Sequence, residues 1–190
     1  DFPGLQQPLS ALKPEAYQQR DRDGSLLAGL TPTWGGTVQV GPQTIDGVTY
    51  PVGVDYQPGL PNAPFPLKGP KAEDLPLSLV TRDLWHVFYQ NQMQINNGKN
   101  DQFVAWADAG GLPMGYYPQS RYSLRLWDVA REFVLCDNFF QGAFGGSFLN
   151  HQYLVSATAP FYPSAPTSAA REQIARLQSD DPLDPRLKPL

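Results

Sequence analysis

The chain has 190 residues, of which 12% are aromatic and 17% charged, and its formal net charge at pH 7 is −4. So many aromatic residues exclude a disordered chain, and the negative charge argues against a nucleic-acid partner held by phosphate neutralisation. No stretch approaches the roughly 18 uninterrupted apolar residues that a transmembrane segment needs. The single cysteine, Cys136, excludes an internal disulfide and a cysteine-cluster metal site.

Composition changes near residue 70. The first segment, 1–70, holds more than half of the 20 prolines and is expected to be rich in loops. Within it, alternation over 36–41 predicts a strand, and the Asp46-Gly47 pair predicts a hairpin turn in a small β-ribbon over 36–52. The second segment, 71–190, carries the periodic apolar patterns and is interpreted as one incomplete domain.

Helical periodicity recurs along the second segment. The predicted helices lie within 71–96 (ending at Asn96-Asn97-Gly98) and over 100–108, 120–133, Ser147–Thr158 and Thr167–Gln178. The apolar run Phe133–Cys136 predicts one buried parallel strand, with Cys136 as a buried thiol. The fold class is therefore α/β. Because a single core strand does not complete a parallel sheet, we expect the chain to be part of something larger.

The most informative pattern places Ser147 after two glycines, between the predicted strand and a predicted helix. Backbone N–H groups at a helix N-terminus stabilise a phosphate or an oxyanion, and glycines let a ligand approach closely. A serine placed there is a suitable nucleophile if a base or a metal activates it. The alternative is that Ser147 only caps the helix, which is the commoner role of serine at this position.

Four runs of residues resemble the phosphoesterase family that contains bacterial phospholipases C and the respiratory-burst-inhibiting acid phosphatases. They are LCDNFF at 135–140, GGSFLNHQY at 145–153, FYQNQMQINNGKND at 88–101 and MGYY at 114–117. The resemblance is nearer to the acid phosphatase branch. It implies an alkaline-phosphatase-like α/β sandwich, of which this chain would be a part.

The resemblance also implies roles for individual residues. Ser147 matches the family's nucleophile, which in the acid phosphatase branch is also a ligand of one divalent metal ion. His86 matches a histidine that contacts the phosphoryl group, although a helix histidine in a structural role is the alternative. On the helix that carries Ser147, Asn150 and His151 are expected to bind phosphate, or Asn150 to support the helix.

Two metal-ligating motifs of the family are missing: the Glu-Asn-Arg-Ser-Phe-Asp type and the Asp-Glu-Asn-Gly-Gly-Phe-Trp-Asp-His type. The chain therefore resembles an internal fragment that lacks the metal cage and is inactive, or nearly so, by itself. The remaining segments of the enzyme would be supplied by another chain, or these 190 residues are only a part of the enzyme. The same resemblance implies a periplasmic or secreted enzyme.

Three functions are compatible with these patterns. The first is a metal-dependent acid phosphatase that acts on small phosphomonoesters through a phosphoserine at Ser147. The second is a phospholipase C that acts on a phospholipid, with aromatic residues around a lipid-facing mouth, although these residues are also typical of a core: Phe139, Phe140, Phe144, Phe161 and Tyr162. The third is a non-catalytic binding module that uses the ribbon and Trp34.

Overall fold

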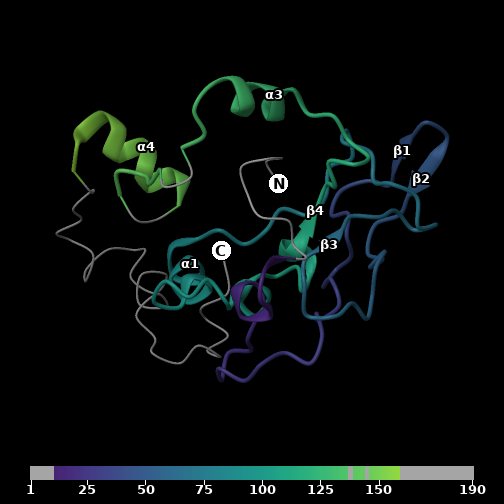
Figure 1. Ribbon diagram of the computed structural model, residues 1–190, viewed down its shortest axis with the longest axis horizontal. Helices are drawn as coiled ribbons and strands as arrows, with labels where there is room; N and C mark the ends of the chain where they lie inside the picture. Colours follow the sequence, from purple (N-terminus) through teal and green to yellow (C-terminus); the bar gives the residue numbers. More distant parts are fainter. Residues whose placement is uncertain (1–10, 137–138, 144–145, 159–190) are drawn as a thin grey trace, which may run out of the picture. The chain divides into compact units, whose positions relative to one another are not determined.

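The structure, a computed structural model, describes residues 11–136, 139–143 and 146–158. Figure 1 shows short helices and two small sheets joined by long connections, a mixed α/β structure that confirms the predicted class. The chain divides into two units, Asp1–Phe139 and Phe140–Leu190, and each is described by itself. The predicted helix Thr167–Gln178 lies outside the described residues.

The predicted hairpin is present. Strand β1 (Gln43–Ile45) pairs in antiparallel register with β2 (Val48–Tyr50). Both turn residues have positive φ, 51° at Asp46 and 79° at Gly47, as a type I′ turn requires. Figure 1 shows this hairpin at the edge of the first unit, and Tyr50, only 2% exposed, anchors its base in the core.

The predicted strand over 36–41 is wrong. Val38 is fully buried, but the segment is not paired as a strand. The backbone N–H of Thr37 donates to Val54 O, and the carbonyl of Thr37 accepts from Arg82 N, so two different segments take up its hydrogen bonds. Burial does not follow the alternation either, because Thr37 is buried beside Val38 whereas Val40 is 73% exposed.

A second sheet joins residues far apart in sequence. Strand β3 (Phe65–Pro66) pairs in parallel with β4 (Gly115–Tyr116), and Leu67 N donates to Tyr116 O at 2.9 Å. With only two strands, this sheet has no central strand, so a proline is tolerated in it.

The core of the first unit is built from side chains that these short elements bring together. Its fully buried members include Val38, Tyr50 and Leu75, which are joined by residues as distant as Leu30 and Leu112. The core therefore combines the two segments that composition separates at residue 70.

Helix α1 (Phe88–Ile95) is shorter than the periodicity predicts. It ends as expected at Asn96, where φ is 44°, but residues 81–87 are not helical. Arg82 explains the late start. Its backbone N–H donates to Thr37 O, and its guanidinium donates to the carbonyls of Gly35 and Gly36. These long-range bonds hold the segment in a non-helical path.

The other helices of the first unit agree with the sequence in part. They are α2 (Phe103–Trp106) and α3 (Arg125–Glu132), together with short 3-10 turns at Pro14–Ala16 and Leu112–Met114. In α3 the buried side chains are Trp127 and Ala130, which are three residues apart and so lie on one face of the helix.

The predicted buried strand Phe133–Cys136 is wrong. Phe133 and Val134 are 69% and 84% exposed, and the thiol of Cys136 is exposed as well. A strand needs a hydrogen-bonded neighbour, and none of the strands in the described part of the chain pairs with this segment.

A matched pair of glycine substitutions tests the close packing at Gly36. Its φ is 86°, and a Cβ there would lie 2.4 Å from Val54 N. Gly59 has a similar φ of 73° but open space around it. We expect Gly36→Ala to lower the free energy of unfolding by more than about 2 kcal/mol, and Gly59→Ala by about 1 kcal/mol. Urea denaturation measures both, and equal losses would contradict the packing argument.

Candidate active site

The predicted helix after the glycine turn is present as α4 (Ser147–Ser156). Its N-cap is Gly146, with φ −73° and ψ 178°, and Ser147 is the first helical residue. The interpretation of Ser147 as the cap is therefore wrong. The side chain of Ser147 is exposed. The N-cap residue is a glycine, so it has no side chain that could accept a hydrogen bond from the amide N–H groups of the first turn.

Asn150 connects the helix to the turn that precedes it. Its side chain is 8% exposed. Its Nδ2 donates to Gly146 O at 3.2 Å, and its Oδ1 accepts from Ala143 N at 3.3 Å. The amide therefore bonds to residues on both sides of the undescribed pair 144–145. That Asn150 binds phosphate stays a prediction.

Tyr153, three residues further along α4, packs against the same turn. A Cβ on Gly142 would lie 2.9 Å from Cδ1 and 3.0 Å from Cε1 of the Tyr153 ring. Because Asn150 and Tyr153 are three apart, they lie on one face of the helix. This face contacts the turn at Gly142, Ala143 and Gly146.

In contrast to this face, several residues near Ser147 in the sequence have exposed side chains. His151 is exposed, as are Phe140 and Phe148, at 81% and 76%. Phe139, assigned to the first unit, is 78% exposed, whereas Phe144, Phe161 and Tyr162 lie outside the described residues. The described aromatic residues of this set are therefore not core residues.

His86 lies in the first unit, two residues before α1 rather than on a helix as predicted. Its side chain is 63% exposed. Nδ1 lies 2.5 Å from Leu84 O and 3.7 Å from Asp83 Oδ1. A carbonyl only accepts, so Nδ1 carries a proton and donates, and Nε2 remains for a ligand. That His86 contacts the phosphoryl group stays a prediction.

The described residues do not form a metal centre. No three histidine, cysteine, aspartate or glutamate side chains of the described part gather into a possible ligand set. A divalent cation that prefers oxygen needs several such ligands, and the hydroxyl of Ser147 would supply one.

Residues 26–182 match the model of the phosphoesterase family. The chain belongs to the phosphoesterase family. No curated protein and no solved structure gives a significant match. Membership indicates a hydrolase of phosphoric esters, and the mixed α/β structure is compatible with part of an α/β phosphoesterase domain. The family match does not distinguish the acid phosphatase branch from the phospholipases C.

No helix in the described part of this phosphoesterase is long and apolar enough to cross a bilayer.

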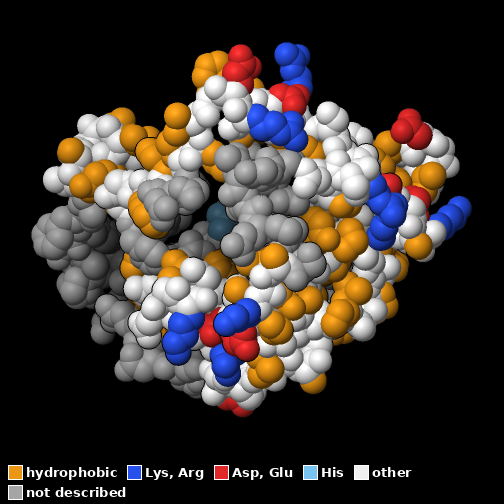
Figure 2. All heavy atoms as spheres, in the orientation of Figure 1, with side chains coloured by type: hydrophobic (Ala, Val, Ile, Leu, Met, Phe, Trp, Pro, Cys, Tyr) orange, Lys and Arg blue, Asp and Glu red, His pale blue; other side chains and the backbone are white. Residues whose placement is uncertain are grey.

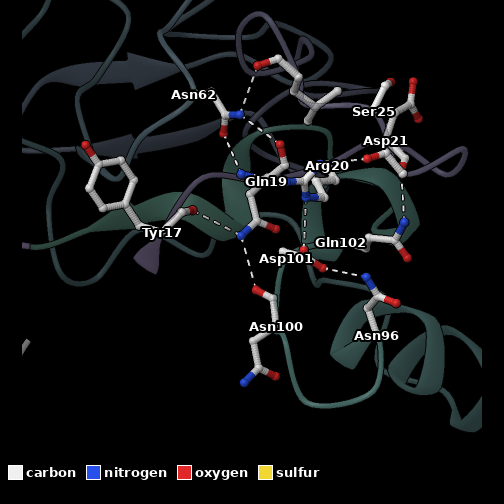
Figure 3. Close-up of polar contacts among 12 residues, drawn as sticks. Tyr17, Gln19, Arg20, Asp21, Ser25, Asn62, Asn96, Asn100, Asp101 and Gln102 are labelled. Atoms are coloured by element: carbon white, nitrogen blue, oxygen red, sulfur yellow. Dashed lines mark hydrogen bonds and ion pairs between the residues drawn. The ribbon is translucent and has the colours of Figure 1, made fainter. Parts of the chain in front are cut away.

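A second polar feature of this phosphoesterase is an amide network in the first unit, which sequence reasoning missed. Figure 3 shows the side-chain amide of Asn62 directed at the backbone of Gln19, with dashed lines for the hydrogen bonds. Asn62 Oδ1 accepts from Gln19 N at 2.8 Å, and Nδ2 donates to Gln19 O and Leu27 O at 2.8 and 2.9 Å. Gln19 in turn donates to Asn100 O and accepts from Phe103 N. A lone asparagine in a proline-rich loop carries no sequence signal for such a role.

An open pocket lies beside this network, but its lining residues are not typical of a phosphate-binding site. Its lining mixes both charges, as Figure 2 shows for this face: Glu15, Arg20, Arg22, Asp23, Lys99 and Asp101. Arg20 pairs with Asp101 at 3.3 Å, and Arg22 lies over the Trp106 ring at 4.6 Å from its centroid. Hydrogen bonds from the side chain and backbone of Ser25 lower the pKa of Asp23. These pairings indicate that the charged residues lining this pocket stabilise the fold and do not bind a ligand.

Substitution of Asn62 tests the network. Asn62→Ala leaves the backbone N–H and C=O of Gln19 and the carbonyl of Leu27 without their side-chain partner. We expect a loss of about 3 kcal/mol in the free energy of unfolding. Gln92→Ala, an exposed amide on α1, is the control and should change stability by less than about 0.5 kcal/mol. Equal unfolding midpoints for the two variants would contradict the assignment.

A double-mutant cycle tests the contact between the turn and α4. Gly142→Ala places a methyl group against the Tyr153 ring and should destabilise this packing by about 1–2 kcal/mol. In the presence of Tyr153→Ala the same change should cost less, because the obstructing ring is gone. Amide hydrogen exchange across residues 142–153 measures both effects. Strictly additive effects would show that the two residues do not interact.

Proposed function

We propose that this chain carries the nucleophile of a metal-dependent acid phosphatase that hydrolyses small phosphomonoesters. The observation that carries the proposal is the exposed Ser147 at the first position of α4, directly after a glycine N-cap, in a chain of the phosphoesterase family. The resemblance of GGSFLNHQY to the acid phosphatase branch supports the choice of phosphomonoesters. The same resemblance supports a periplasmic or secreted enzyme.

The proposed reaction has two displacements at phosphorus. Ser147 Oγ attacks, a P–O bond to serine forms, and the P–O bond to the leaving alcohol breaks while the serine proton passes to the alcohol oxygen. Water then displaces the serine, releasing inorganic phosphate and restoring the hydroxyl. N–H groups of the first turn of α4 would stabilise charge on the phosphoryl oxygens. His86, through Nε2, is proposed to contact the phosphoryl group or to pass the proton on to the leaving alcohol, and His151 is proposed to bind the phosphate.

The proposal includes one divalent metal ion. Because the described residues do not make a complete ligand set, the ligands other than Ser147 would come from further segments of the enzyme. When bound, such an ion would lower the proton affinity of the serine hydroxyl. We expect the isolated 190-residue chain to show little or no turnover.

A phospholipase C is the second candidate. The exposure of Phe140, and of Phe148 next to Ser147 in the sequence, favours it, because exposed aromatic rings suit contact with a lipid. A panel that pairs phosphomonoesters with phosphodiesters separates the two candidates. A binding module is the third candidate, favoured by Trp34, which is 77% exposed, and Ser147→Ala would leave its binding unchanged.

A matched pair of serine substitutions on α4 tests the nucleophile. In the enzyme with all its natural segments, assayed with p-nitrophenyl phosphate and added divalent metal, Ser147→Ala should lower kcat at least about 10³-fold. Ser156→Ala, at the other end of α4, should keep kcat within about two-fold, because its hydroxyl bonds only Gln152 O and the nearby Thr158. Intact-mass measurement should detect a phosphate adduct that Ser147→Ala lacks. Full activity of Ser147→Ala would exclude the proposal.

A further inference from the structure

We infer that Asn150 is a positioning residue, which sets the direction of the Ser147 hydroxyl by fixing the peptide between Gly146 and Ser147. The inference rests on the proposed function of Ser147. It assigns Asn150 a task different from the phosphate contact that the family resemblance implies.

The contacts of Asn150 carry the inference. Gly146 O accepts two hydrogen bonds from this one residue, from the backbone N–H at 3.3 Å and from Nδ2 at 3.2 Å. The first bond is the ordinary helical one, and the second is added by the side chain. Oδ1 meanwhile accepts from Ala143 N at 3.3 Å. One N–H group of the amide and its oxygen are thus both directed at the turn.

A glycine N-cap makes this second bond important. Glycine has the widest range of backbone conformations. Gly146 by itself therefore limits the rotation of the peptide plane between Gly146 and Ser147 less than any other residue would. Rotation of that plane turns the amide N–H of Ser147 and shifts its Cα–Cβ bond. Because Gly146 O belongs to that peptide, a buried donor on this oxygen limits the rotation. The Tyr153 ring, packed under Gly142, supports the same turn from one helical turn away.

The bond to Gly146 O gives Asn150 a task that phosphate binding does not require. Nδ2 carries two N–H groups, and the one that bonds to Gly146 O at 3.2 Å is directed at the start of the helix and not at a ligand. Positioning acts on the serine and not on the phosphate. Loss of a positioning residue should therefore lower kcat and leave phosphate affinity nearly unchanged. A small displacement of a reacting atom can cost up to about 10²-fold in rate.

Two variants and a control test the inference in the enzyme with all its natural segments. Asn150→Asp keeps an acceptor for Ala143 N but replaces the donor to Gly146 O by an oxygen, and Asn150→Ala removes both. Val155→Ala, at a side chain that is 84% exposed on the same helix, is the control. For both Asn150 variants we expect kcat for p-nitrophenyl phosphate to fall at least about 10-fold. The inhibition constant of inorganic phosphate should stay within about two-fold for Asn150→Ala, which adds no charge to the site, and the control should resemble the unsubstituted enzyme. Circular dichroism checks that each variant is folded.

A second readout does not depend on activity. Hydrogen exchange of the Ser147 amide, measured without substrate, should accelerate in both Asn150 variants and not in Val155→Ala. Unchanged exchange, or unchanged kcat despite faster exchange, would overturn the inference. Weaker phosphate inhibition of Asn150→Ala in proportion to the loss of kcat/KM would also overturn it and assign direct contact. If Ser147→Ala stays active while Asn150→Ala speeds exchange, the proposed function of Ser147 is wrong. Asn150 then only stabilises the turn before α4.

Discussion

Backbone N–H and C=O groups that are buried in loops have no neighbouring strand or helical turn to pair with, so other groups must bond to them. In this protein side-chain amides do so. Most of the buried polar residues in the described part are asparagine or glutamine: Gln19, Asn62, Gln90, Gln94, Gln102 and Asn150. An amide suits this task because it carries a donor and an acceptor side by side and has no charge to desolvate. With 20 prolines and few regular elements, the first unit depends on this form of pairing.

The same arrangement recurs at the turn before Ser147. Asn62 joins three backbone groups of a loop in the first unit, and Asn150 joins two backbone groups of the turn in the second. The first arrangement supports a fold, whereas the second is the one that we propose orients the hydroxyl of Ser147. One chemical solution thus serves stability in one unit and the orientation of the proposed nucleophile in the other.

Local patterns in the sequence predicted local structure well. The Asp46-Gly47 pair identified the hairpin because only a few residue types tolerate positive φ at both turn positions. Asn96 identified the end of α1 for a similar reason, since its φ is 44°. The glycines before Ser147 identified the start of α4, where Gly146 is the N-cap. The family, too, could be predicted, since the runs that resemble it are contiguous.

Features set by distant partners could not be predicted in this way. Residues 81–87 have an apolar spacing that suits a helix, yet the bonds of Arg82 to residues 35–37 determine their path. His86 therefore lies before α1 and not on it. Asn62 has no distinctive neighbours in sequence, and its role follows only from the three groups that surround it in space.

The exposed run from Phe133 to Cys136 has a practical consequence for handling the protein. Two apolar side chains of high β-propensity stand open to solvent beside an exposed thiol. Such a segment readily associates with an identical segment of a second molecule, and two thiols brought together in this way are readily oxidised. Preparations of this chain should therefore be kept dilute and under reductant, because air would convert a reversible association into a covalent dimer.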